Sequence, residues 1–282
     1  MKINNSYAVN RHQLTNIQLE DMYSVVKEGL QANREEDKKY NLKRKYILVT
    51  GDSWAQGEID STKPEDWSEN HSLSYYLSNL FPYAYVGVSI PNPGWDDLES
   101  VCMVQILYEL FDYIVFFKTC GLRTVQFSTN PGRKDYGITE EAFREADIYN
   151  IILQGRAIND IVYDFLQPYA SKLILIGGLN KIAGKGLDLK TVLTIPSVLE
   201  RYDSKVADVD VFGWENMWDF YKDKVKGNQE YQESLLTIMD IFAKKKKYME
   251  SKPDLYFPDG KHPNDKIHKN LAEYLGDYLW KQ

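Results

Sequence analysis

The sequence predicts an α/β fold, a three-layer α/β/α sandwich with a central parallel sheet. Four short apolar runs, rich in β-branched and aromatic residues and bounded by turn residues, are typical of strands buried on both faces. Segments compatible with helices lie between these runs, and strands that alternate with helices imply right-handed crossovers between parallel strands. The predicted strands cover residues 46–50, 84–90, 113–119 and 172–177.

The other elements follow from the same periodicities. Helices are expected over 72–80, 98–110 and 140–169, with two more over 228–248 and 271–280, the last of them amphipathic. Residues 191–198 and 209–212 are candidates for further strands.

The chain begins with a polar segment that holds a helix-like stretch at 16–33 and a charged run at 34–44. This pattern predicts an N-terminal helical and polar extension over residues 1–44. With no internal repeat and no low-complexity linker, residues 45–282 are expected to form a single domain.

Composition excludes several classes of protein. The 282 residues are 43% hydrophobic, enough for a full core, and the net charge of −7 argues against a nucleic-acid partner, whose phosphates require Lys and Arg. The N-terminus lacks the apolar centre of a secretory signal, and no run approaches the roughly 18 apolar residues of a membrane span. The sequence therefore predicts a cytoplasmic protein without a membrane partner.

No metal or other cofactor is expected. Cys102 and Cys120 lie in or beside apolar segments and have no spacing typical of metal ligands. No cluster of histidine, cysteine and carboxylate residues has convincing zinc spacing.

A serine follows the first predicted strand, in the stretch LVTGDSWAQGE (residues 48–58). Ligands of open parallel sheets gather at the carboxyl ends of strands, and Ser53 occupies that place. Serine and aspartate are also common helix caps at such a turn, so Ser53 is either a nucleophile or a cap. A nucleophile needs a base, an orienting carboxylate and donors for the oxyanion.

Two of the four histidines lie in FPDGKHPNDKIHKN (residues 257–270), each three residues after an aspartate. The pair Asp259 and His262 is flanked by glycine and proline and is therefore in a loop, where the aspartate can hold Nδ1–H and leave Nε2 for a nucleophile. Asp265 and His268 fall where the last helix begins. On these residues alone, His262 is either this base or a surface loop histidine. As the base, its Nε2 is expected within about 3.5 Å of Ser53 Oγ, with Asp259 on Nδ1.

These two segments carry a family resemblance. Gly51-Asp52-Ser53 after the first strand, together with Asp259-Gly260-Lys261-His262-Pro263, resembles the SGNH (GDSL-type) hydrolases, a superfamily of serine esterases and acyl hydrolases. Two of the four family blocks match and bracket residues 51–268. The resemblance implies the flavodoxin-like SGNH hydrolase fold, and it implies Ser53 as nucleophile with His262 and Asp259 completing a triad.

The family's oxyanion hole is matched less completely. The resemblance implies the N–H of Ser53 and that of a glycine after the second strand, for which Gly94 is the candidate, an ordinary turn glycine being the alternative. The third block, Gly-x-Asn, is altered because Gly121 is followed two residues later by Arg123. Either Asn130 supplies the missing side-chain donor, or Arg123 does, as in a variant seen in phage-associated members. A neutral amide imposes no charge on the resting site, which favours Asn130.

Two other enzyme or ligand classes fit the sequence poorly. An α/β-hydrolase needs several strands before its nucleophile and a wide separation of its Asp and His. The stretch GGLNKIAGKG (residues 177–186) fails the P-loop spacing, because Leu179 stands five residues before Gly184 and Lys185 is followed by glycine.

The predicted function is therefore a serine hydrolase that cleaves an ester bond through an acyl-enzyme. The 21 Tyr and 6 Trp favour a carbohydrate O-acetyl ester, so that a small-molecule or glycan ester is the expected substrate, with lipid and small aryl esters as the alternatives. Two alternatives stay open: an O-acyltransferase that uses the same site, and a non-catalytic glycan-binding or structural module of this fold. The altered third block and the insert at 124–139 favour the second alternative.

Overall fold

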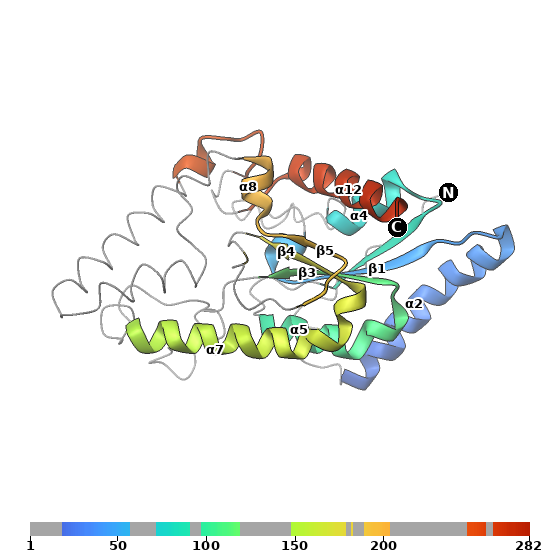
Figure 1. Ribbon diagram of the computed structural model, residues 1–282. Coiled ribbons are helices and arrows are strands. Elements are labelled where there is room, and N and C mark those ends of the chain that lie inside the picture. The colour runs from blue at the N-terminus through green and yellow to red at the C-terminus, as the bar shows by residue number, and fades with distance from the viewer. Residues whose placement is uncertain are drawn as a thin grey trace.

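A computed structural model of the chain shows an α/β fold built on one five-stranded parallel sheet (Figure 1). The strand order, β2-β1-β3-β4-β5, is that of flavodoxin-like doubly wound folds. The strands are β1 (Lys45–Thr50), β2 (Tyr85–Ser89), β3 (Tyr113–Lys118), β4 (Leu173–Gly177) and β5 (Leu193–Ile195). The structure describes residues 19–56, 72–90, 97–118, 148–178, 182, 189–203, 247–257 and 262–282.

Helices cover both faces of the sheet and make three layers (Figure 1). One face carries α2 (Leu19–Tyr40), α5 (Asp97–Leu107) and α7 (Ile148–Leu166), and the other carries α4 (Leu73–Leu80), α8 (Val198–Tyr202) and α12 (Asp265–Trp280). The predicted three-layer sandwich with a parallel sheet is confirmed.

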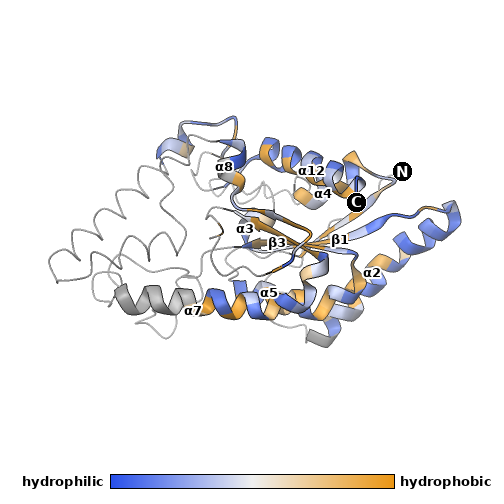
Figure 2. Cartoon of the chain, in the orientation of Figure 1, coloured by the Kyte–Doolittle hydropathy of each residue, from blue (hydrophilic) through white to orange (hydrophobic). Residues whose placement is uncertain are grey.

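The strand residues alternate between the two faces, as a period of two requires. In β3, Phe116 packs in the core beneath α5 and α7, while Val115 and Phe117 pack in the core beneath α4 and α12. All three side chains are almost completely buried. Figure 2 shows that the strands are mainly apolar, whereas α2 and α12 mix apolar and hydrophilic residues, as helices packed on one side must.

Most of the predicted elements are present, with shifted ends. The segment predicted as one helix over 98–110 is α5 followed by a 3-10 turn, Tyr108–Leu110, and the strand expected within 191–198 is the three-residue β5. The closing helix begins at Asp265, where the Asn264 side chain caps it by accepting the Lys266 N–H at 3.0 Å. The strand predicted at 209–212 and the helix predicted at 228–248 lie outside the described residues, except for positions 247 and 248.

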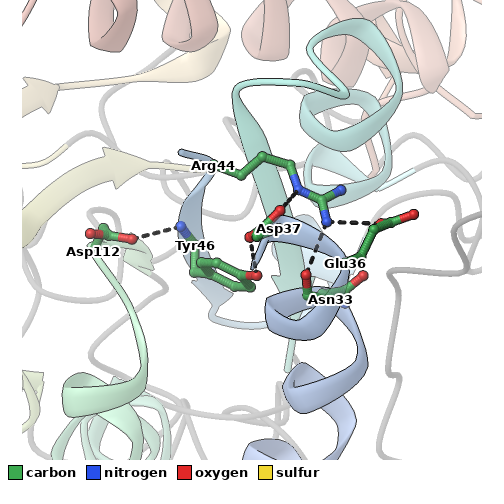
Figure 3. Close-up of polar contacts among 6 residues, drawn as sticks. All are labelled: Asn33, Glu36, Asp37, Arg44, Tyr46 and Asp112. Carbon is green, nitrogen blue, oxygen red and sulfur yellow. Dashed lines mark hydrogen bonds and ion pairs between the residues drawn. The ribbon is translucent and has the colours of Figure 1, made fainter. Parts of the chain in front are cut away.

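Helix α2 extends further than expected, since residues 34–40 of the predicted charged run are helical. The physical reason is a buried ion-pair network at the start of β1 (Figure 3). The Arg44 guanidinium donates to Asp37 at 2.5 Å and to Glu36 at 3.0 Å, and the Tyr46 hydroxyl donates to Asp37 at 2.5 Å. Burial, reinforced by the Asp37 carboxylate, raises the pKa of Tyr46 above its usual value, so the hydroxyl stays protonated as a donor.

The same helix contributes to the core of the domain. Met22, Val26 and Leu30 of α2 are buried in one cluster with residues of the sheet. Part of the segment predicted as an N-terminal extension therefore packs on the sheet, while the division at residue 44 stays a prediction. Among the helices that the structure describes, none has the length and apolar character needed to cross a membrane.

Candidate active site

The turn after β1 places Ser53 at the carboxyl edge of the sheet, as predicted. The chain leaves β1 for β2 on one side and later returns to β3 on the other, so the ends of β1 and β3 form the switch point where such folds bind ligands. Ser53 is the first residue of α3 (Ser53–Gln56) and is 6% exposed.

The turn is tight because of Gly51, whose φ of +145° is a conformation that other residues rarely adopt. A Cβ at this position would lie 2.7 Å from Phe117 Cβ and 2.9 Å from the Phe117 carbonyl oxygen. The end of β3 thus lies directly against the turn that presents Ser53.

Asp52 provides the side-chain cap of this turn. Its Oδ1 accepts the Trp54 N–H at 2.9 Å, and its carbonyl accepts the Ala55 N–H at 3.0 Å. The Ser53 hydroxyl is directed elsewhere, since Oγ lies 2.8 Å from His262 Nε2. The contact that the sequence predicts between these two side chains is therefore present.

A short antiparallel ladder holds the backbone of His262. The Phe257 N–H donates to the His262 carbonyl at 3.0 Å, and the Asn264 N–H donates to the Leu255 carbonyl at 2.9 Å. Pro263, which follows the histidine, is buried in an isolated bridge with Tyr256. His262 is partly exposed, and this ladder orients it toward the serine from the sheet face that carries α12.

A buried carboxylate that the sequence analysis did not identify supports that ladder. Asp203, at the end of α8, accepts from Lys252 Nζ at 2.7 Å, from the Tyr248 hydroxyl at 2.8 Å and from the Tyr256 hydroxyl at 3.3 Å. Burial raises the pKa of the Tyr256 hydroxyl, with a further contribution from the Asp203 carboxylate. The donors recur every four residues, but their shared acceptor lies 45 residues before the first of them, so spacing alone could not identify it.

The second Asp-His pair belongs to the closing helix, as expected. Asp265 is the first residue of α12, and His268, in the first turn, is 1% exposed.

The other predicted site residues lie outside the described residues. They are the orienting Asp259 and the oxyanion candidates Gly94, Arg123 and Asn130, whose roles stay predictions. Within the described part of the chain, no group of three or more histidine, cysteine or carboxylate residues could hold a metal ion.

A buried polar cluster beside the switch point was also missed. Lys118 ends β3 and is 7% exposed, and its ammonium donates to Asp97 Oδ2 at 2.8 Å and to Asn159 Oδ1 at 2.6 Å. It also lies over the Tyr163 ring, 5.6 Å from the centroid. The only signal in the sequence is a lysine that ends an otherwise apolar strand.

Comparisons with known proteins give structural similarities only. Neither a protein-family model nor a curated protein matches the sequence. An esterase from Pseudoalteromonas sp. is 11% identical, with 84% of this chain and 97% of that chain covered and a TM-score of 0.37. A lipase/acylhydrolase from Enterococcus faecalis is 15% identical, with 84% and 94% covered and a TM-score of 0.33. An acetyl xylan esterase from Butyrivibrio proteoclasticus is 12% identical, with 85% and 64% covered and a TM-score of 0.37.

Proposed function

We propose that the protein is a serine hydrolase of the SGNH (GDSL-type) superfamily that cleaves an ester bond. The observation that carries this proposal is the 2.8 Å separation between Ser53 Oγ and His262 Nε2 at the switch point of the sheet. A serine hydroxyl beside an imidazole, where ligands of this fold bind, is the arrangement that nucleophilic catalysis needs. The paired GDS and DGKHP segments support the same family.

In the proposed reaction, Ser53 Oγ attacks the ester carbonyl while His262 Nε2 takes the hydroxyl proton. The tetrahedral intermediate collapses when the imidazolium returns that proton to the leaving alcohol, which leaves an acyl-serine. Water then attacks the acyl-serine with His262 again as the base, and the carboxylic acid and free Ser53 are released. Asp259 is proposed to hold Nδ1–H, which keeps Nε2 free to accept the proton.

The oxyanion hole is proposed to comprise the N–H groups of Ser53 and Gly94 and one side-chain donor. We expect Asn130→Ala to lower kcat by roughly 10²-fold with little change in KM, because a donor used only in the transition state is lost. Steady-state kinetics of Asn130→Ala and Arg123→Ala decide between the two donors. A silent Asn130→Ala combined with an inactive Arg123→Ala assigns the donor to Arg123 and places the site with the phage-associated variant.

The proposed substrate is a small-molecule or glycan ester, with a carbohydrate O-acetyl ester favoured. The support is compositional: 21 Tyr and 6 Trp supply flat rings with polar edges, which suit contacts with sugars.

The experiment that tests the proposal combines hydrolysis with covalent labelling. Wild-type protein is expected to hydrolyse p-nitrophenyl acetate and to gain one phosphonyl group from an activated alkylphosphonate, on the peptide that contains Ser53 by mass spectrometry. Ser53→Ala is expected to lose both the hydrolysis and the label. Ser24→Ala, which changes an exposed serine of α2, is the matched control and is expected to keep both.

The same experiment separates the alternatives. Transfer of the acetyl group to an added alcohol in preference to water would identify an O-acyltransferase. Activity that persists unchanged in Ser53→Ala would refute Ser53 as the nucleophile, whereas a wild-type protein that neither hydrolyses the ester nor takes up the label would leave the non-catalytic binding module.

A further inference from the structure

The buried cluster at the end of β3 joins three elements by charge-assisted hydrogen bonds. Lys118 ends β3, Asp97 begins α5, and Asn159 lies within α7. The ion pair measures 2.8 Å, with the lysine and aspartate side chains 8% and 0% exposed. Both of these contacts to Lys118 are therefore made away from water.

A buried ion pair of this kind contributes little net stability. Removing two charges from water costs free energy, and the attraction between them does little more than offset that cost. Proteins in which such a pair is replaced by apolar residues of similar volume are often as stable. Removing one partner is very different, because the remaining charge is left buried and uncompensated. What the pair does supply is a fixed geometry among the segments that it connects.

One of those segments, the end of β3, packs against the turn that carries the proposed nucleophile. Phe117, which precedes Lys118, lies against Gly51, two residues before Ser53, in the layer beneath α4 and α12. The Lys118 side chain extends to the sheet face covered by α5 and α7, whereas His262 reaches Ser53 from the face covered by α12. In an acyl transfer, the oxyanion donors are needed on the side opposite the base.

We propose that Asp97, Lys118 and Asn159 are positioning residues that hold the end of β3 and the start of α5 where the oxyanion side of the Ser53 site is formed. The proposal rests on the proposed hydrolase function and deepens it. Asp97 stands three residues after Gly94 and Lys118 five residues before Arg123, so the cluster anchors the chain beside both expected donor segments.

The test separates positioning from stability by breaking the pair and then removing both charges. Lys118→Met is expected to lower Tm by roughly 10 °C, since the buried Asp97 carboxylate loses its ion pair with the lysine. The double variant Lys118→Met/Asp97→Asn is expected to regain most of that Tm. Its kcat for p-nitrophenyl acetate is nevertheless expected to stay about 10² lower than wild type, with KM within threefold, because displaced donors impair the transition state more than substrate binding.

The matched control is the ion pair at the opposite edge of the sheet, Arg44 with Asp37, whose side chains are 1% and 12% exposed. Arg44→Met is expected to lower Tm by a similar amount, and Arg44→Met/Asp37→Asn to regain part of it, both with kcat close to wild type. A wild-type kcat in Lys118→Met/Asp97→Asn would overturn the proposal, and so would an equal loss of kcat in the control pair.

Two further arms complete the test. If the Lys118 double variant does not fold, Asn159→Ala takes its place, because this variant keeps the ion pair. Asn159→Ala is expected to lower kcat about tenfold at unchanged KM, and an unchanged kcat would overturn the proposal.

Wild-type and Ser53→Ala protein are assayed in parallel. An inactive wild type refutes the hydrolase function itself, whereas an active wild type with a fully active double variant refutes only the positioning role.

Discussion

Replacing His262 by alanine is expected to lower kcat for p-nitrophenyl acetate by a factor on the order of 10⁴ to 10⁶. The Ser53 hydroxyl would lose the imidazole nitrogen that lies 2.8 Å from its oxygen, and no base would take its proton during attack. Because His262 is partly exposed and lies in a loop, the fold is expected to survive the change. A continuous assay of p-nitrophenol release measures kcat, and the thermal unfolding curve shows whether the fold is retained.

The double variant Ser53→Ala/His262→Ala provides the control for this result. Residues that act as one catalytic unit are not additive, so the double variant is expected to be no slower than the slower single variant. A folded His262→Ala protein that keeps more than a tenth of the wild-type kcat would contradict the role of His262 as the base.

Gly51→Ala is expected to lower the free energy of unfolding by about 3 kcal/mol or more. The new Cβ would lie 2.7 Å from Phe117 Cβ and 3.1 Å from Ala55 Cβ, at a φ of +145° that alanine rarely adopts. The backbone and side chain of Phe117 can make room for this Cβ only if the end of β3 is displaced. Urea unfolding of wild type and variant measures the loss.

Gly178→Ala is the matched control, since its Cβ would meet the Trp54 side chain at 3.5 Å, an ordinary contact distance. This variant is expected to change the free energy of unfolding by less than about 1 kcal/mol. Equal losses in the two variants would show that the tight turn before Ser53 is not the source of the effect.

The sequence predicts the elements of this fold that depend on local pattern. Strands β1 to β4 are mainly apolar and almost entirely buried, so composition and turn residues suffice to locate them. The sequence favours His262 over His268 as the base because proline and glycine mark His262 as a loop residue, and the structure places His268 in the first turn of α12.

Contacts that depend on the assembled sheet could not be predicted in this way. Lys118 meets Asp97 and Asn159 across 21 and 41 residues, and no periodicity connects positions on a strand with positions on two different helices. The ion pairs that extend α2 to Tyr40 have the same character, since a charged run gives no sign of which residues will be buried against β1.

Ser53 and His262 stand 209 residues apart in the sequence. Ser53 follows the first strand of the sheet, whereas His262 precedes the last helix. The histidine is carried by the segment that leads into α12, whose Ile267, Leu271 and Leu275 are buried against the layer that also holds α4. During refolding, the sheet and the nucleophile turn can therefore form while the dyad is still incomplete. Recovery of the proposed esterase activity would then report the docking of the closing helix, a long-range event that circular dichroism of the helices and strands would not resolve.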